Sequence, residues 1–212
     1  MALLPSLPSR LSIEETKQFA HLASTNKQEE IEEILPHILK HTNADKACSR
    51  ALLKAAKNGY TAIVALLAPH ARVAYLDGAA LLMASQNGHT EAVKALGVDQ
   101  YPSETVFKAL VLASQNGHTK IVEHLLPFTN PKMHQSQPLQ KASMMQHVDI
   151  FDFLYPVSDP KQALKSMAKD NFRTDQMALL KQRIEDAQTR ERLEDAFSTQ
   201  TATTAKTNVK KM

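Results

Sequence analysis

The chain has 212 residues and a formal net charge of +3, with 43% hydrophobic and 22% charged residues, as is ordinary for a soluble protein. Its 5 Gly, 5% aromatic residues and absence of Trp argue against an all-β sandwich and favour helices. The charge is also weaker than that of a dedicated nucleic-acid-binding protein.

The N-terminal sequence, MALLPSLPSR, holds a short apolar stretch broken by two prolines and no basic segment, so it is unlike a secretion signal. No apolar run approaches the ~20 residues that a membrane-spanning helix requires. The single cysteine, Cys48, excludes an intrachain disulfide and suits a reducing compartment. We therefore expect a soluble, cytoplasmic protein without a membrane span.

Residues 1–48 form an N-terminal region that we predict to contain a helical capping unit, in which Leu22–Asn26 leads into Ile31–Leu35. His37 and His41 stand four residues apart, as zinc ligands on one helix face can. No further Cys, Asp or Glu completes a recognisable ligand spacing. We predict an exposed histidine pair, with no metal site and no cofactor.

Residues 49–157 contain four copies of a unit that recurs every 29 residues. The heptapeptide ASQNGHT stands at Ala84–Thr90 and returns unchanged at Ala113–Thr119. The aligned first halves are ALLKAAKNG at 51–59, ALLMASQNG at 80–88, ALVLASQNG at 109–117 and PLQKASMMQ at 138–146. Self-similarity at one period of this size is typical of a solenoid.

Each unit is predicted to be a pair of short helices. A Leu and an Ala three residues apart lie on one face of the first helix, and a second apolar segment follows. The turn between the two helices holds a glycine, which can adopt the left-handed conformation that ends a helix: Gly59, Gly88 or Gly117. A proline ends the second helix: Pro69, Pro127 or Pro156. Such short helices are unstable alone, so stacking of the units has to build the core.

The units resemble the ankyrin repeat, whose motif runs T-P-L-H-x-A-A-x-x-G-H-x-E-I-V-x-L-L-L. ASQNGHTKIVEHLL at 113–126 follows its second half, and QPLQKA at 137–142 keeps P-L-x-x-A of its first half. The period here is 29 residues, against about 33 for the family, and no unit carries the full T-P-L-H. The missing residues fall in the connections, so we expect the β-hairpin fingers to be shortened or absent. The repeats are similar in style to the compact repeats found in proteins of intracellular bacteria.

The resemblance implies an all-α solenoid that binds a protein partner through the concave face of the array, and it implies a monomer. Contacts are expected from variable first-helix positions and from residues that enter each unit. These positions are Ser49, Lys57, Asn58, Gln86, Asn87, Phe107, Gln115, Asn116, Ser136, Met144 and Met145. The change from Lys57 through Gln86 and Gln115 to Met144 gives a polar-to-apolar gradient, and Met suits adaptable binding.

Three other groups of residues leave alternatives open. His89, His118 and His147 recur at the repeat period, which favours a structural hydrogen bond to the turn backbone over catalysis. Nucleic-acid binding would use four lysines and the basic tail: Lys54, Lys57, Lys94 and Lys108. An unrecognised enzyme would use His37, His41 or Cys48, but no catalytic motif surrounds them. We predict that the protein is not an enzyme.

Residues 158–197 are predicted to form a degenerate C-terminal repeat, with Asn171 in place of the turn glycine, and a charged capping helix over Ile184–Phe197. The pairs Asp186–Arg190 and Arg190–Glu194 would support that helix. Residues 198–212 are small and polar, so we expect a disordered tail. Such a tail is similar to C-terminal signals of effectors that bacterial type IV secretion systems export into a host cell.

Overall fold

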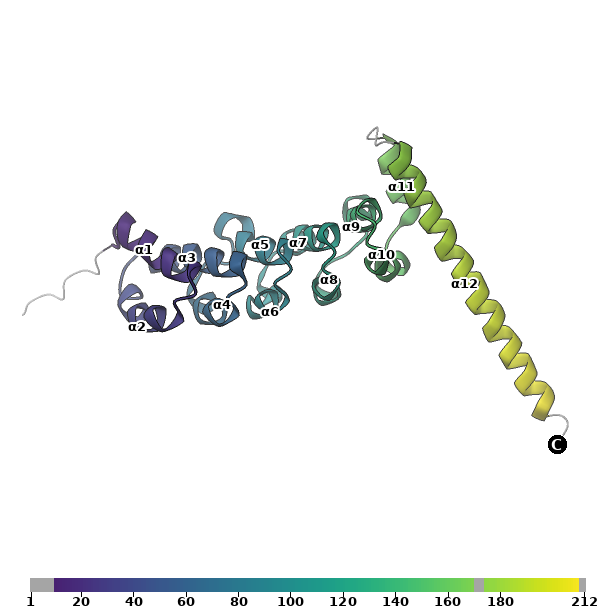
Figure 1. Ribbon diagram of the computed structural model, residues 1–212, viewed down its shortest axis with the longest axis horizontal. Helices are drawn as coiled ribbons and strands as arrows, with labels where there is room; N and C mark the ends of the chain where they lie inside the picture. Colours follow the sequence, from purple (N-terminus) through teal and green to yellow (C-terminus); the bar gives the residue numbers. More distant parts are fainter. Residues whose placement is uncertain (1–9, 170–173, 210–212) are drawn as a thin grey trace, which may run out of the picture. The chain divides into compact units, whose positions relative to one another are not determined.

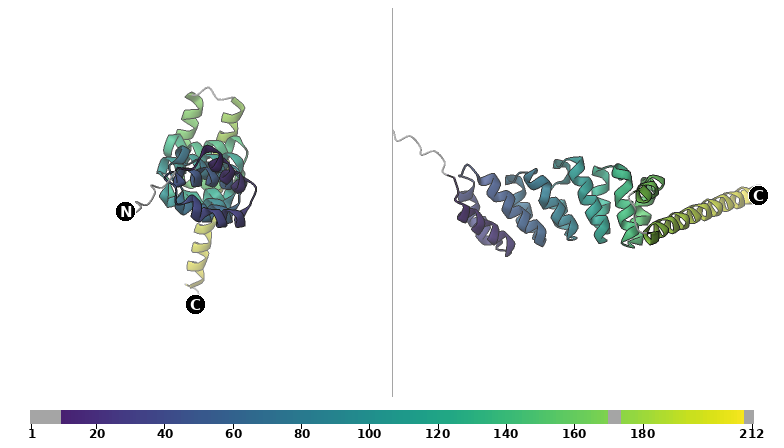
Figure 2. Two further views of the ribbon diagram at one scale, coloured as in Figure 1. Left: turned by 90° about the vertical axis from the view of Figure 1, so that its left-hand side faces the viewer. Right: turned by 90° about the horizontal axis from the view of Figure 1, so that it is seen from above.

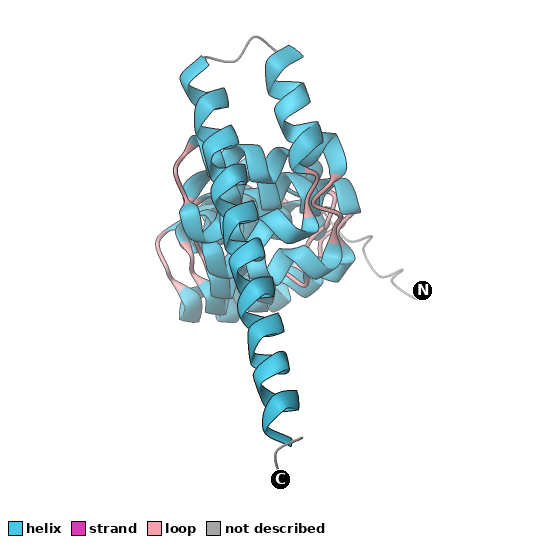
Figure 3. Ribbon diagram, turned by 90° about the vertical axis from the view of Figure 1, so that its right-hand side faces the viewer, coloured by secondary structure: helices cyan, strands magenta, loops and turns pink. Residues whose placement is uncertain are grey.

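The structure, a computed structural model, describes residues 10–169 and 174–209 (Figure 1). Every regular element in these ranges is helical, and they contain no strand (Figure 3). The chain divides into two compact units, residues 1–130 and residues 131–212. The predicted all-α architecture is therefore confirmed, and each unit is described separately.

The first unit is built from four helix pairs. The helices are α1 (Ile13–Ser24), α2 (Gln28–Ile38), α3 (Ala44–Asn58), α4 (Thr61–Leu67), α5 (Ala79–Gln86), α6 (Thr90–Ala95), α7 (Ser103–Asn116) and α8 (Thr119–Leu125). The first helices of the pairs, α1, α3, α5 and α7, contact one another in order and form one layer. The second helices, α2, α4, α6 and α8, form the other layer, and the pairs stack side by side in a row (Figure 2).

The core of the first unit lies between these layers, at the positions that recur. The first helices bury Leu52, Leu81 and Leu110 together with the alanines three residues later, and none of these side chains is more than 4% exposed. The second helices bury Ile63, Val64 and Leu67, and the equivalent Ile121, Val122 and Leu125, completely. Burial of a large aliphatic side chain contributes about 1.5–3 kcal/mol, so packing against similar neighbours stabilises helices that are too short to be stable alone.

The glycine turn has the predicted conformation. Gly59, Gly88 and Gly117 have φ values of 75°, 80° and 81°. The backbone N–H of the residue after each glycine donates to the carbonyl of the alanine five residues earlier, as His89 does to Ala84 at 3.0 Å. This is the bond that closes a helix at a left-handed residue.

His89 and His118 form the predicted structural hydrogen bond to backbone, and the acceptor belongs to the preceding repeat. His89 Nε2 lies 3.0 Å from the carbonyl of Lys57, and His118 Nε2 lies 3.0 Å from the carbonyl of Gln86. A carbonyl only accepts, so each ring nitrogen is the donor. Each bond therefore reaches the preceding repeat and not the turn of its own repeat.

The same histidines explain why the turn residue is glycine and not asparagine. A Cβ at Gly59 would lie 2.5 Å from His89 Nδ1, and a Cβ at Gly88 would lie 2.7 Å from His118 Cε1. The heptapeptide ASQNGHT thus joins neighbouring repeats. Its alanine packs in the core, and its glycine forms the left-handed turn and leaves space for the histidine ring of the next repeat. Its own histidine donates a hydrogen bond to a carbonyl of the previous repeat.

The connections between repeats are short turns. Pro69 and Pro127 lie in the 3₁₀ turns Ala68–His70 and Leu126–Phe128 that follow α4 and α8, which confirms that proline ends the second helix. A second turn, Tyr75–Gly78, leads into α5. No β-hairpin finger is present among the described residues, as the short period predicts.

The second unit contains α9 (Met133–Met144), α10 (Val148–Leu154), α11 (Pro160–Lys169) and α12 (Thr174–Val209), with a 3₁₀ turn at Tyr155–Val157 that holds Pro156. Helix α12 packs on α9 and α11 and buries Leu180, Ile184 and Ala187. Residues 191–196 of α12 are exposed.

In the C-terminal region the structure adds a partner to Arg190 and differs from the predicted disordered tail. The Arg190 guanidinium binds both carboxylate oxygens of Asp152 on α10, at 2.6 and 2.9 Å, in addition to its electrostatic attraction to Asp186 and Glu194 on its own helix. A bidentate partner offers more to a planar guanidinium than a single oxygen four residues away. Helix α12 continues to Val209, where disorder was expected from residue 198, because residues 174–209 contain no Gly or Pro to end it. Asn171 lies outside the described residues, and export through the tail stays a prediction.

We predict that Gly88→Ala lowers the free energy of unfolding by about 1–2 kcal/mol because alanine is strained at positive φ, with a further loss from the displaced His118 ring. His118→Ala alone should cost about 1 kcal/mol for its hydrogen bond. In the double variant the new methyl group meets no ring, so its loss should be smaller than the sum of the single losses. Urea denaturation followed by circular dichroism measures all three, and additive losses would contradict the contact.

Gln146 occupies the turn position in the second unit with φ of 62° and carries a side chain there. We predict that Gln146→Gly raises the free energy of unfolding by about 0.5–1 kcal/mol, because glycine removes left-handed strain that exceeds its own entropic cost. Met145→Gly is the matched control, since Met145 has φ of −90°. The Met145→Gly variant should show no increase in the free energy of unfolding in the same urea titration.

Candidate functional site

The exposed side chains of the first helices form one continuous surface of the first unit, which we call the first-helix face. On α3 this face carries Lys46, Arg50, Lys54 and Lys57, all of which are exposed. At the equivalent positions α5 presents Met83 and Gln86, and α7 presents Lys108, Leu112 and Gln115. These positions lie on the side of each first helix that the core does not use, so a partner can reach them.

Eight of the eleven predicted contact residues have surface-accessible side chains. Lys57, Asn58, Gln86, Asn87, Asn116 and Met145 are exposed, and Gln115 and Met144 are half-buried. Met144 and Met145 belong to the second unit, where they end α9. The structure thus gathers Lys57, Gln86 and Gln115 on the first-helix face and puts the two methionines on a separate body.

The side chains of the predicted contact residues Asn58, Asn87 and Asn116 form hydrogen bonds to backbone carbonyls, which were not predicted from the sequence. Asn58 Nδ2 donates to the carbonyl of Ser24 at 3.0 Å, and Asn87 Nδ2 donates to the carbonyl of Lys57 at 2.8 Å. Each amide therefore ties its repeat to the one before it, and Asn87 shares its acceptor with His89. Asn116 Nδ2 donates to Leu112 of its own helix at 2.8 Å.

Three predicted contact residues are wrong, because Ser49, Phe107 and Ser136 are at most 2% exposed. They occupy one repeat position, near the start of a first helix. Ser49 Oγ accepts the Arg72 backbone N–H at 2.8 Å, and Ser136 Oγ accepts the Asp159 backbone N–H at 2.8 Å. In both repeats the serine holds the chain that leads into the next repeat, which removes it from any partner.

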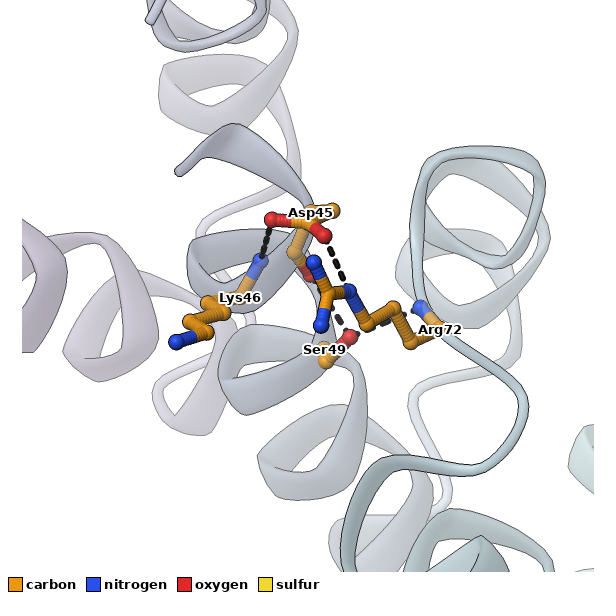
Figure 4. Close-up of polar contacts among 4 residues, drawn as sticks. All are labelled: Asp45, Lys46, Ser49 and Arg72. Atoms are coloured by element: carbon orange, nitrogen blue, oxygen red, sulfur yellow. Dashed lines mark hydrogen bonds and ion pairs between the residues drawn. The ribbon is translucent and has the colours of Figure 1, made fainter. Parts of the chain in front are cut away.

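The connection at Ser49 also engages the neighbouring acidic residue (Figure 4). Arg72 Nε donates to the Asp45 carboxylate, and the other carboxylate oxygen accepts the Lys46 backbone N–H at 2.7 Å. The Lys46 ammonium points away from Asp45 (Figure 4). Asp45 is therefore committed to the connection, and it does not neutralise the Lys46 side chain.

Four basic residues form a stripe on α3, and only two of them were predicted from the sequence to belong to a basic surface. Lys46, Arg50, Lys54 and Lys57 are spaced by four, four and three residues, which places them on one helix face. Only Lys54 and Lys57 were singled out from the sequence. The spacing itself was the available signal, but the helix had to extend back to Ala44 for Lys46 and Arg50 to join it.

Lys94 and Lys108, which the nucleic-acid hypothesis groups with Lys54 and Lys57, do not lie together. Lys94 is on α6, in the second-helix layer, where its Nζ binds Glu91 Oε1 at 2.8 Å. Lys108 is exposed on α7. The four lysines therefore do not form one basic surface.

The residues considered for metal binding or catalysis do not assemble a site. His37 Nε2 and His41 Nε2 lie 3.3 Å apart, and no third ligand joins them among the described residues. Cys48 is buried. Burial, and to a lesser degree the nearby Asp45 charge, raises the pKa of its thiol from 9.0 to about 11. The thiol is protonated at neutral pH, which is the opposite of what a nucleophile needs.

Comparison with solved structures shows that the chain is similar to the crystal structure of the human ASB11 ankyrin repeat domain. The TM-score is 0.59 at 19% sequence identity, over 78% of this chain and 82% of that chain. The sequence matches no protein-family model and no curated protein. The likeness confirms the predicted ankyrin-repeat fold. None of the described helices combines the length and apolar character that crossing a membrane requires.

We predict that the stability of the protein declines as pH rises from about 9 towards 11, in part because of Cys48. The unfolded thiol ionises near its ordinary pKa of 9.0, whereas the folded thiol stays protonated up to about 11. Ionisation in that window therefore favours the unfolded chain. Urea midpoints measured across the window should fall less steeply for Cys48→Ala, and equal slopes for both proteins would contradict the burial.

Proposed function

We propose that this chain is a non-catalytic protein-interaction module, which binds a protein partner through the first-helix face of its first unit. The ankyrin-repeat fold supports this proposal, because it is a fold of protein–protein interaction modules and typically carries no catalytic site. The buried, protonated Cys48 thiol and the two-histidine pair also lack the constellation that an enzyme would need.

The observation that carries the proposal is a contrast between conserved and varied positions within the chain itself. From repeat to repeat the core alanines, the turn glycines and the inter-repeat histidines recur. On the first-helix face, Lys54 is followed at the equivalent positions by Met83 and Leu112. The residues that stabilise the fold are the same in successive repeats, whereas the solvent-exposed residues of the first-helix face differ between them. This contrast suits a rigid scaffold that presents a specific surface.

The middle of the face supplies apolar area for such contacts. Met83 and Leu112 are half-buried, so part of each side chain is open to solvent between the flanking polar residues Gln86, Lys108 and Gln115. Exposed methionine adapts its shape to a partner, and an apolar centre with a polar rim is typical of a protein interface.

We predict that Met83→Glu with Leu112→Glu abolishes capture of the partner, because two charged carboxylates would replace the apolar centre of the face and lose their hydration when the partner binds. Tagged protein would be incubated with cell lysate, and captured proteins would be identified by mass spectrometry. The matched control is Ala62→Glu with Ala65→Glu, which places two glutamates on the exposed side of α4 in the opposite layer.

Both variants should keep the circular dichroism spectrum and the urea midpoint of the original protein. The α4 variant should still capture the partner. Equal capture by all three proteins would show that the first-helix face is not the binding surface, and equal loss in both variants would do the same.

A further inference from the structure

We infer that the basic stripe of α3 and the cleft at its N-terminal end bind an acidic segment of a protein partner, one that carries apolar residues among its carboxylates. This inference rests on the proposed function and adds the chemistry of the partner. The stripe is defined by Lys46, Arg50, Lys54 and Lys57, and it extends over about 16 Å of helix at 1.5 Å per residue.

The charges of the stripe are not compensated within the protein. Among the described residues, none of the four side chains forms an ion pair or a hydrogen bond, and Lys46, Arg50, Lys54 and Lys57 are all exposed. Asp45, the one acidic residue within α3, binds Arg72 (Figure 4). Like charges spaced by three or four residues repel each other on a helix. A partner that carries carboxylates would relieve this repulsion as well as pair with each cation.

A cleft of about 450 Å³ opens at the start of the stripe, beside the N-terminal ends of α1 and α3. Lys46 and Arg50 line it together with Arg10, so three cations face one hollow. Ile13 and Tyr75 line it as well, and the Ile13 side chain is 73% exposed. The cleft therefore offers an apolar seat next to cations, which suits a leucine or phenylalanine flanked by glutamate or aspartate.

The neighbouring helix favours a protein over a nucleic acid. At the positions equivalent to Lys46, Arg50, Lys54 and Lys57, the next repeat has Tyr75, Ala79, Met83 and Gln86, none of which is charged. The row of cations is thus not continued on the neighbouring helix, whereas a nucleic acid presents regularly spaced phosphates that need an extended basic track. An uncharged, partly apolar strip beside the stripe suits an acidic peptide with apolar residues on one side.

The test uses the full chain and a fluorescein-labelled peptide in which pairs of glutamates alternate with leucine. Binding is followed by fluorescence anisotropy at low and at physiological salt. The original protein should bind the peptide, and the affinity should fall as salt screens the charges. A peptide with glutamine in place of glutamate, and a fluorescein-labelled single-stranded oligonucleotide, should both bind more weakly than the glutamate peptide.

The decisive variant is Arg50→Glu with Lys54→Glu, which reverses the centre of the stripe. It should weaken binding of the glutamate peptide by about tenfold or more, since two attractive pairs become repulsive. It should also gain binding to the same peptide with lysine in place of glutamate, a result that a misfolded protein cannot give. The matched control is Lys40→Glu with Lys120→Glu, an equal charge change off the stripe, which should leave peptide affinity unchanged.

Unchanged affinity in the stripe variant, or equal losses in both variants, would overturn the inference. Tighter binding of the oligonucleotide than of the peptide would also overturn it, in favour of a nucleic-acid partner. Capture from lysate separates this inference from the proposed function. If the stripe variant keeps a partner that Met83→Glu with Leu112→Glu loses, then the face binds protein and only its acidic preference is wrong.

Discussion

The bond from a histidine ring to a backbone carbonyl of the preceding repeat is the interaction on which the first unit depends. A helix leaves its last carbonyls without intrahelical donors. At the end of α3 three of these carbonyls have donors: Ala55 and Ala56 accept the N–H groups of the turn, and Lys57 accepts from His89 and Asn87. One repeat thereby completes the helix end of another, and the repeats are held at a constant spacing.

This joint determines which residues have to repeat. The histidine ring occupies space that a Cβ at the glycine would fill, so this position has to be glycine. The glycine also forms the left-handed turn, and the alanine carbonyl five residues before the histidine position accepts the N–H that closes this turn. The serines at 49 and 136 hold the following connections in the same way from the other end of the first helix. Between these two ends, the exposed side of the first helix takes no part in joining repeats, so its residues are free to differ.

Because these residues can differ from repeat to repeat, the first-helix face can present a surface that is specific to one partner. On α3 this face carries four cations in a row, and on α5 and α7 it carries methionine, leucine and glutamine together with Lys108. The commitment of Asp45 to Arg72 matters here, because an acidic residue at the foot of the stripe would otherwise cancel part of its charge. A structural ion pair on one side of α3 leaves the other side electrostatically open.

Much of the fold follows from the sequence alone, because the buried side and the ends of a helical hairpin are marked by local sequence patterns. The spacing of Leu and Ala locates the buried side, the glycine and the proline mark the two ends, and the period counts the repeats. These are local rules, and the structure confirms them at Gly59, Gly88 and Gly117 and at the prolines. The short period also correctly predicted connections without β-hairpin fingers among the described residues.

Only the tertiary structure decided which variable positions are free. Ser49 and Ser136 are small and polar, like surface residues, but the connection to the next repeat covers them, and Phe107 at the same position is equally buried. Asn58 and Asn87 donate to carbonyls 34 and 30 residues earlier in the chain, and Arg190 reaches Asp152, 38 residues away. The composition and spacing of a segment report its own helix, whereas its partners across repeats depend on how separate segments meet in space.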